Sequence, residues 1–314
     1  MDRTGLVFFS SLMAALMIIG CASKKPPESE VKLTKEEQQL LDDYKAEINV
    51  GRNMAGRLFA FYGEYEDPGL TAYINQVGRF VAKNGDYPDR KYMFGILDSD
   101  SVNAFACPGG YILVTRGVIR SAENEAELGA ILGHESAHVG KQHMFKTLKS
   151  MSKDDLAKAE AEFKAKRRPD KHSRARTRIM SEENDGLAAV AKLMMTASGA
   201  GIGILQAAKA GMGLLLEKGL DKDLEFEADR EGVKYAIRAG YEPKALDQFL
   251  ARLAEQKKKS SDKTVMDVTH PSIPDRRQEI ANVLNKMSAS EIIGAVGKDR
   301  YDAARSTLLS KKKG

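Results

Sequence analysis

The chain has 314 residues, a formal net charge of +5, five histidines and two cysteines. Even without a leader, this length is enough for one large core or two small ones. The charge excess is modest and no aromatic residues are interleaved with the basic ones, so we expect no nucleic-acid partner.

The first twenty residues are typical of an export signal. Residues 6–19 are nearly all apolar but too short to span a bilayer comfortably, and they end in Ile18-Ile19-Gly20-Cys21. This end resembles a bacterial lipobox, which implies removal of residues 1–20 and a lipid on Cys21. An ordinary signal peptide or a signal anchor is the alternative. Residues 21–33 then form a polar tether.

Once Cys21 carries a lipid, Cys107 is the only other cysteine, so no internal disulfide is expected. The physical expectation for Cys107 is a buried small apolar side chain.

Apolar periodicity and turn residues predict helices and strands before the central motif. Thr34 and Glu37 form a capping box that opens the first helix. The predicted elements are helices from Thr34 to about Phe61 and from Pro68 to about Gly85, then strands at 91–97, 104–107 and 111–115.

The next helix carries the most informative motif, His134-Glu135-Ser136-Ala137-His138. Asn124 is the expected N-cap of this helix. Residues four apart lie on one helical face, so the two imidazoles can bind one zinc ion with Glu135 beside a bound water. A chance match is the alternative.

The second half of the chain is predicted to be helical around a basic insertion. The insertion covers about 150–185, and its basic stretch, 164–178, is either a solvated loop or a contact for anionic lipid or an acidic partner. The apolar stretch 193–208 is expected to be a buried helix rather than a membrane contact. Further helices are predicted at 221–239, from Pro243 to Leu253 and at 274–287, before a tail at 291–314.

A catalytic zinc usually takes three protein ligands, so one more is needed. His143 follows the motif, but a helical continuation would turn it away from His134 and His138. Glu225 and Asp229 are four apart and share a helical face, while Glu227 points to roughly the opposite side. On spacing alone, a zinc ligand at Glu225 and a solvated acidic face are equally good interpretations.

The motifs together resemble peptidase family M48 from about residue 45 to 285. The matching stretches are His134–His138, Glu225 to Asp229 within Glu-Ala-Asp-Arg, 103–111, and Thr269-His270-Pro271-Ser272 with Arg276. The resemblance implies that His134, His138 and Glu225 bind zinc, that Glu135 is the general base, and that Asp229 holds a ligating histidine. It is nearest to compact, lipid-anchored periplasmic members, without the membrane-spanning helices or helical-repeat domain of other branches.

The implied fold is α+β: a mostly helical zincin-like (gluzincin) domain at 34–290 with a three-stranded sheet beside the motif helix. His270 is expected to donate to the oxyanion, to approach the metal and hold the site shut, or only to cap a loop. Arg276 is expected to brace carboxylates. If the strand Tyr111, Ile112, Leu113 and Val114 lies at the edge of the sheet, an extended peptide can add to it.

We expect a zinc endopeptidase, lipid-anchored on the periplasmic side of a bacterial membrane, that clears unfolded or damaged envelope proteins. Ala22 after Cys21 favours the outer membrane. The alternatives are a lipoprotein that assembles outer-membrane proteins with latent proteolysis, and a structural zinc protein. Glu135 favours catalysis, because a structural zinc site does not need it.

Overall fold

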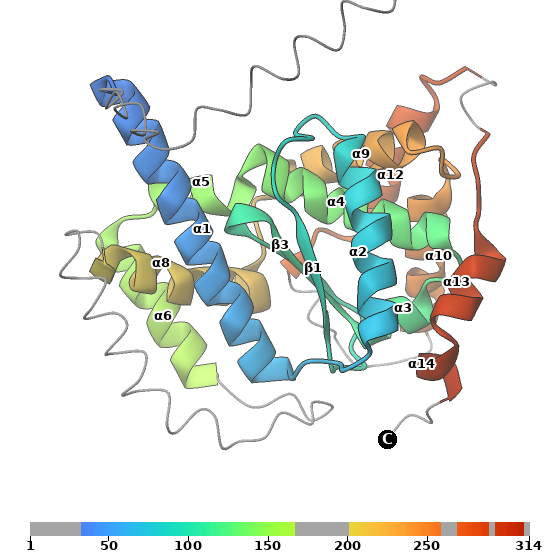
Figure 1. Ribbon diagram of the computed structural model, residues 1–314, viewed down its shortest axis with the longest axis horizontal. Helices are drawn as coiled ribbons and strands as arrows, with labels where there is room; N and C mark the ends of the chain where they lie inside the picture. Colours follow the sequence, from blue (N-terminus) through green and yellow to red (C-terminus); the bar gives the residue numbers. More distant parts are fainter. Residues whose placement is uncertain (1–32, 167–200, 259–268, 289–292, 311–314) are drawn as a thin grey trace, which may run out of the picture. The chain divides into compact units, whose positions relative to one another are not determined.

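The computed structural model describes residues 33–166, 201–258, 269–288 and 293–310. By internal contacts the chain divides into two units, residues 1–41 and 42–314. The predicted signal peptide, Cys21, most of the tether, the basic stretch beyond residue 166 and residues 259–268 lie outside the described residues. The predicted mostly helical α+β fold with one small sheet is confirmed (Figure 1).

The described elements follow the predicted order with small shifts. The strands are β1 (Met93–Leu97), β2 (Ala104–Cys107) and β3 (Tyr111–Thr115), with the short helical turns η1 (Pro108–Gly110) and η2 (Leu214–Lys218). The helices are α1 (Lys35–Tyr62), α2 (Pro68–Lys83), α3 (Arg116–Ser121), α4 (Glu125–Lys141), α5 (His143–Ser150), α6 (Lys153–Lys166), α8 (Gly201–Gly213), α9 (Lys222–Arg238), α10 (Ala245–Lys258), α12 (Ile273–Leu284), α13 (Lys298–Ala304) and α14 (Ser306–Ser310). The shorter helices α3, α5, α13 and α14, and α6 within the predicted insertion, had no predicted counterpart.

Side-chain caps explain where the main helices begin. Thr34 and Glu37 exchange hydrogen bonds of 3.1 and 2.8 Å with each other's backbone, which is the predicted capping box. The Asn124 side chain accepts a hydrogen bond of 3.0 Å from the amide of Glu127, so the motif helix begins where the sequence indicates.

β3 is the central strand of the sheet, with β1 parallel on one side and β2 antiparallel on the other. The prediction that Tyr111–Val114 forms an edge strand is therefore wrong, because both sides of β3 are already paired. The turn that returns the chain from β2 to β3 depends on Gly110, at φ 101°. A Cβ there would lie 1.8 Å from the carbonyl oxygen of Lys91.

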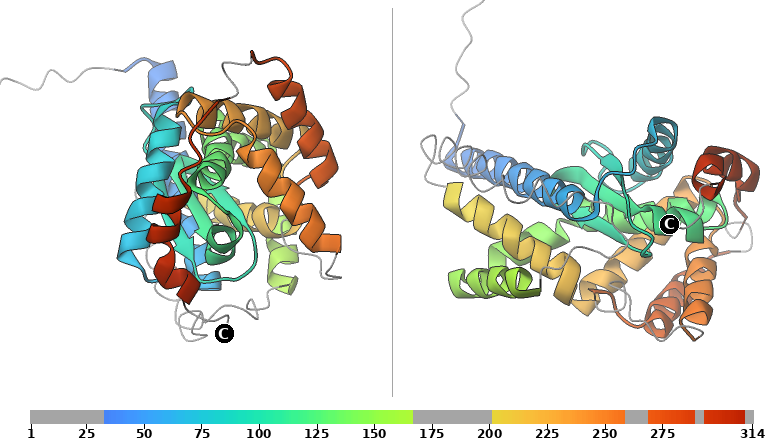
Figure 2. Two further views of the ribbon diagram at one scale, coloured as in Figure 1. Left: turned by 90° about the vertical axis from the view of Figure 1, so that its right-hand side faces the viewer. Right: turned by 90° about the horizontal axis from the view of Figure 1, so that it is seen from below.

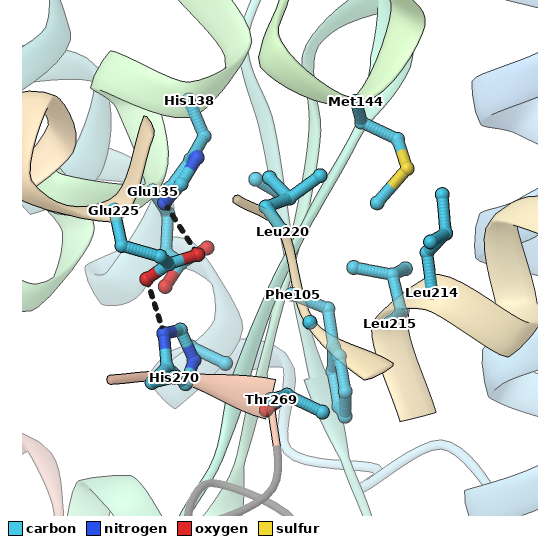
Figure 3. A pocket seen from close by; sticks show the side chains of 13 residues that line it. Phe105, Glu135, His138, Met144, Leu214, Leu215, Leu220, Glu225, Thr269 and His270 are labelled. Atoms are coloured by element: carbon cyan, nitrogen blue, oxygen red, sulfur yellow. Dashed lines mark hydrogen bonds and ion pairs between the residues drawn. The ribbon is translucent and has the colours of Figure 1, made fainter. Parts of the chain in front are cut away.

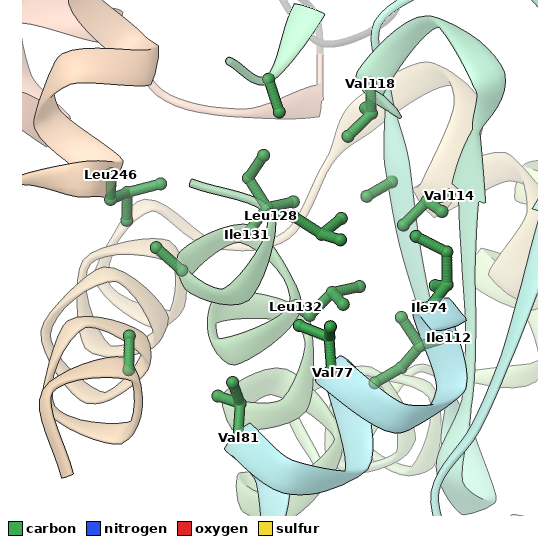
Figure 4. Packing of buried hydrophobic residues seen from close by; sticks show 14 of the residues in the cluster. Ile74, Val77, Val81, Ile112, Val114, Val118, Leu128, Ile131, Leu132 and Leu246 are labelled. Atoms are coloured by element: carbon green, nitrogen blue, oxygen red, sulfur yellow. The ribbon is translucent and has the colours of Figure 1, made fainter. Parts of the chain in front are cut away.

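The sheet lies between two apolar clusters because its side chains alternate. One face, including Phe94, Ile112 and Val114, packs against α2 and α4 (Figure 4). The other face, including Phe105 and Leu113, packs against α1, α5 and α8. Apart from its last residue, α4 is buried along its whole length, so the motif is held inside the protein.

The C-terminal segment is part of the main core, which corrects its interpretation as a tail. Tyr301 and Leu308 are fully buried in the same cluster as α4. The Tyr301 hydroxyl donates to the carbonyl of Ile119 at 2.7 Å, and Arg305 donates to the same carbonyl at 3.0 Å. Residues 293–310, which include α13 and α14, thus supply side-chain hydrogen bonds to the backbone carbonyls at the C-terminal end of α3 (Figure 1).

The predicted insertion begins as ordered structure rather than as a loop. Its described part includes α6, which lies beside α8 (Figure 2). In α8, Ala208 at the end of the apolar stretch is buried, and so are Ala210 and Met212 just beyond it, whereas residues 193–200 lie outside the described part. None of the described helices is both long enough and apolar enough to cross a membrane.

Candidate metal centre and catalytic site

The site forms where α4 and α9 touch backbone to backbone. A Cβ on Gly133 would lie 2.7 Å from the carbonyl oxygen of Gly232, and a Cβ on Gly232 would lie 2.5 Å from the amide nitrogen of His134. Any larger residue at either position would push the helices apart. This close approach brings the α9 carboxylates within reach of the α4 histidines.

His134, His138 and Glu225 converge on one point, and each is only 2–3 % exposed. The two Nε2 atoms of His134 and His138 are 3.1 Å apart. The Glu225 carboxylate lies 3.6 Å from Nε2 of His134 and 3.5 Å from Nε2 of His138. One donor atom from each residue lies within 4.8 Å of the others. Two imidazoles and one carboxylate are a donor set that suits a divalent metal ion and leaves a position open.

Asp229 contacts the ring nitrogen of His134 that faces away from the candidate metal position, and Arg276 holds Asp229. Oδ1 of Asp229 lies 2.9 Å from Nδ1 of His134, and the Arg276 guanidinium makes two bonds to the same carboxylate, at 2.7 and 2.9 Å. Asp229 is 0 % and Arg276 is 3 % exposed. A carboxylate bonded to Nδ1 fixes the ring orientation of a metal-binding histidine and leaves its Nε2 free to bind the metal.

The buried charges shift the pKa values of this group. Burial lowers the pKa of His134, but the Asp229 carboxylate outweighs it and raises the pKa to about 9. Burial would raise the pKa of Asp229, yet the Arg276 and His134 charges hold it below its usual range. The predicted bracing role of Arg276 thus has a direct geometric counterpart, although sequence alone did not pair it with Asp229.

His143 lies against His138 instead of joining the metal-binding group. Its Nδ1 is 2.9 Å from Nδ1 of His138, and its Nε2 is 3.1 Å from Oε2 of Glu227. Burial and the neighbouring His138 lower the pKa of His143 to about 4. The sequence placed neither residue at the site. His143 was expected to turn away on a helix that continues through it, whereas α4 ends at Lys141, and Glu227 was expected on the opposite helical side from Glu225.

Glu135 is buried and lines a small pocket beside His138 and Glu225 (Figure 3). The cavity has a volume of about 30 Å³, which is room for one or two water molecules. Apolar side chains line the wall away from the carboxylates: Phe105, Met144, Leu214, Leu215 and Leu220. Of these, only Phe105 lies in a stretch that the sequence analysis singled out, 103–111; no sequence pattern pointed to the other four.

His270 reaches the same pocket from the segment before α12. Its Nδ1 lies 2.5 Å from Oε2 of Glu225. Figure 3 marks this contact with a dashed line. Burial would raise the pKa of Glu225, but the charges of His270 and His138 hold it well below its usual range. His270 therefore does more than cap a loop: it contacts a candidate metal ligand directly.

The strand that borders the pocket is β2, not β3. Ala104, Phe105 and Ala106 all line the cavity. The amide of Thr115 donates to the carbonyl of Asn103 at 3.0 Å. Because an antiparallel ladder alternates, the backbone groups of Ala104 and Ala106 face away from β3. The backbone edge that the sequence analysis assigned to residues 111–114 is thus supplied by residues 104–107.

The family model described as Peptidase family M48 matches residues 68–284. A beta-barrel assembly-enhancing protease of Yersinia pestis is 29% identical over 221 residues, covering 70% of this chain and 40% of the relative. The protein of the same name in Escherichia coli K12 is 26% identical over 223 residues with the same coverage. The mitochondrial metalloendopeptidase OMA1 of Schizosaccharomyces pombe is 26% identical over 118 residues, covering 37% of this chain and 32% of the relative. The aligned part of the chain spans about two fifths of the two bacterial relatives.

The Asp229–Arg276 pair gives a stability prediction. Arg276→Ala leaves Asp229 buried without its partner, so the free energy of unfolding should fall by about 3–5 kcal/mol in urea titration of the metal-free protein. The matched control is Arg277→Ala, which breaks an ion pair with Asp247 in which Arg277 is 43 % exposed and should cost less than about 1 kcal/mol. Equal losses in the two variants would contradict the bracing role of Arg276.

Proposed function

Because the chain belongs to peptidase family M48, we propose that it is a zinc-dependent endopeptidase that cleaves unfolded or damaged proteins of the bacterial envelope. The observation that carries the proposal is the buried convergence of His134, His138 and Glu225, with Glu135 beside them. A structural zinc site would not need a further carboxylate at this position, so the arrangement favours catalysis over a structural role.

The roles of the residues follow from their positions. A zinc ion held by His134, His138 and Glu225 would supply Lewis acidity that activates water and polarises the scissile carbonyl. Glu135 is placed to take a proton from that water and return it to the leaving amine. His270, on the far side of Glu225, is placed to donate to the developing oxyanion when it leaves that carboxylate.

We propose that substrate binds in an extended form along β2. The backbone groups of Ala104 and Ala106 face away from β3 and border the pocket that holds Glu135. The Ala104 amide already donates to the Asn103 side chain at 2.9 Å, so the amide of Ala106 and the two carbonyls are the groups offered to substrate. Main-chain hydrogen bonds recognise the substrate backbone and not its side chains, so this mode of binding suits unfolded chains of varied sequence. The cavity beside Glu135 is too small for a peptide, so substrate entry requires movement of the wall opposite β2, which is formed by Leu214, Leu215, Gly219, Leu220, Thr269 and His270.

A second candidate function is assembly of outer-membrane proteins with proteolysis held latent. Two observations favour it. Bacterial relatives are called beta-barrel assembly-enhancing proteases, and His270, which lines the pocket, contacts the candidate ligand Glu225 directly. For either function, the lipobox-like sequence ending at Cys21 supports a lipid anchor on the periplasmic side of a membrane, with the outer membrane favoured by Ala22.

Glu135→Gln tests catalysis directly. The variant should retain about one zinc per chain by elemental analysis, because the ligands are untouched, while casein cleavage falls by about 100-fold or more. Chelator treatment of the parent should have the same effect on cleavage. Undiminished cleavage by the variant, or a folded parent that contains no zinc, would refute the peptidase assignment. If the variant still supports outer-membrane protein assembly in cells, the second function is favoured.

Ala106→Pro tests the substrate edge. It removes an amide that faces away from β3, so the protein should stay folded by circular dichroism while kcat/KM on an unfolded substrate falls about tenfold. Ala106→Gly keeps the amide and serves as the control. Leu113→Pro breaks the central strand and should unfold the protein. If Ala106→Pro is folded and cleaves as well as Ala106→Gly, substrate does not pair with β2.

The lipid anchor is tested on the two cysteines. In a bacterial host fed with labelled palmitate, Cys21→Ser should abolish incorporation of the label and release the protein from the membrane fraction. Cys107→Ser should change neither result, because Cys107 is buried in the core. Label retained by Cys21→Ser would exclude Cys21 as the lipidated residue.

A further inference from the structure

The two candidate histidine ligands are held in different ways at their second ring nitrogen. Nδ1 of His134 meets a carboxylate, Asp229, at 2.9 Å. Nδ1 of His138 meets another imidazole, that of His143, at the same distance. His143 in turn contacts Glu227 at 3.1 Å. A carboxylate therefore also supports His138, but through His143 rather than by direct contact.

A break in the helix places His143. Gln142 adopts a left-handed conformation, with φ 61° and ψ 34°, and ends α4. His143 is then the first residue of α5 and is buried against His138 instead of continuing around the α4 surface. Lys141, the last residue of α4, makes an ion pair of 3.1 Å with Glu227 and holds this carboxylate in place.

The proton positions in this chain of contacts follow from bonding rules. If Nε2 of His138 binds a metal ion, it carries no proton, so the neutral ring carries its proton on Nδ1. That proton can only be donated to His143 if Nδ1 of His143 is an acceptor. The proton of His143 then sits on Nε2, where Glu227 accepts it. All three groups are satisfied by this one arrangement.

We propose that His143 is a positioning residue of the metal centre: as a neutral acceptor oriented by Glu227, it fixes the tautomer and ring orientation of His138. This proposal rests on the proposed metal site. It gives each acid of the Glu225-Phe226-Glu227-Ala228-Asp229 segment a separate task. Glu225 faces the metal position, Asp229 orients His134, and Glu227 orients His138 through His143.

The test measures zinc affinity by competition with a chromogenic chelator. His143→Leu removes the acceptor and should weaken zinc binding by about 10–100-fold. His143→Asn places an oxygen near the position of Nδ1 and should restore most of the affinity. On α9, Glu227→Leu should weaken binding, whereas Glu231→Leu, one turn further along and paired with Lys234, should leave it unchanged.

Three outcomes would overturn the proposal: unchanged affinity in His143→Leu, equal weakening by His143→Leu and His143→Asn, or equal effects of Glu227→Leu and Glu231→Leu. Thermal unfolding of the metal-free variants shows whether they fold. A parent protein that binds no zinc would instead refute the proposed function and not the role of His143 alone.

A measurement on the unaltered protein covers the case in which the His143 variants do not fold. Two-bond nitrogen–proton correlation spectra of the zinc-loaded, ¹⁵N-histidine-labelled chain distinguish the two tautomers of each ring. The proposal requires the Nδ1–H form for His138 and the Nε2–H form for His143. An Nδ1–H form for His143 would refute it.

Discussion

The metal centre depends on a direct backbone-to-backbone contact between two helices. Gly133 and Gly232 let α4 and α9 meet backbone to backbone, and a Cβ on either would lie within 2.7 Å of the opposite main chain. Without this approach Glu225 would not reach His134 and His138. Since α4 is buried along nearly its whole length, largely by α9 and α2, the position of α9 on it is what completes the site.

Electrostatics explain why so many charges are buried around one point. His134, His138, Glu225, Asp229 and Arg276 are all nearly inaccessible to solvent, and isolated charges in such a place would be very unfavourable. Each acid of the α9 segment has a basic partner, and Arg276 balances Asp229 with two hydrogen bonds. The network therefore holds the ligands in position before any metal binds, which lowers the cost of ordering them.

Substrate access depends on elements remote from the motif in sequence. β2 supplies the backbone edge, while η2 and the segment carrying Thr269 and His270 supply the opposite wall. In the described arrangement this wall leaves a cavity of about 30 Å³. Both proposed functions rest on the same geometry. A pocket that must open before a peptide can enter allows cleavage when it opens and keeps proteolysis latent while it does not.

The sequence by itself determined most of the longer helices, the three strands, the caps at Thr34 and Asn124, and the pairing of His134 with His138, because helical spacing and side-chain chemistry are local properties. Spacing left Glu225 open, and the resemblance to the family supplied Glu225, Asp229 and Arg276. The central place of β3, the packing of Tyr301 in the core and the contact of His143 with His138 were decided by tertiary structure. Strand order depends on pairing between distant segments, and His143 is turned inward by a left-handed Gln142, a residue type that gives no signal for such a break.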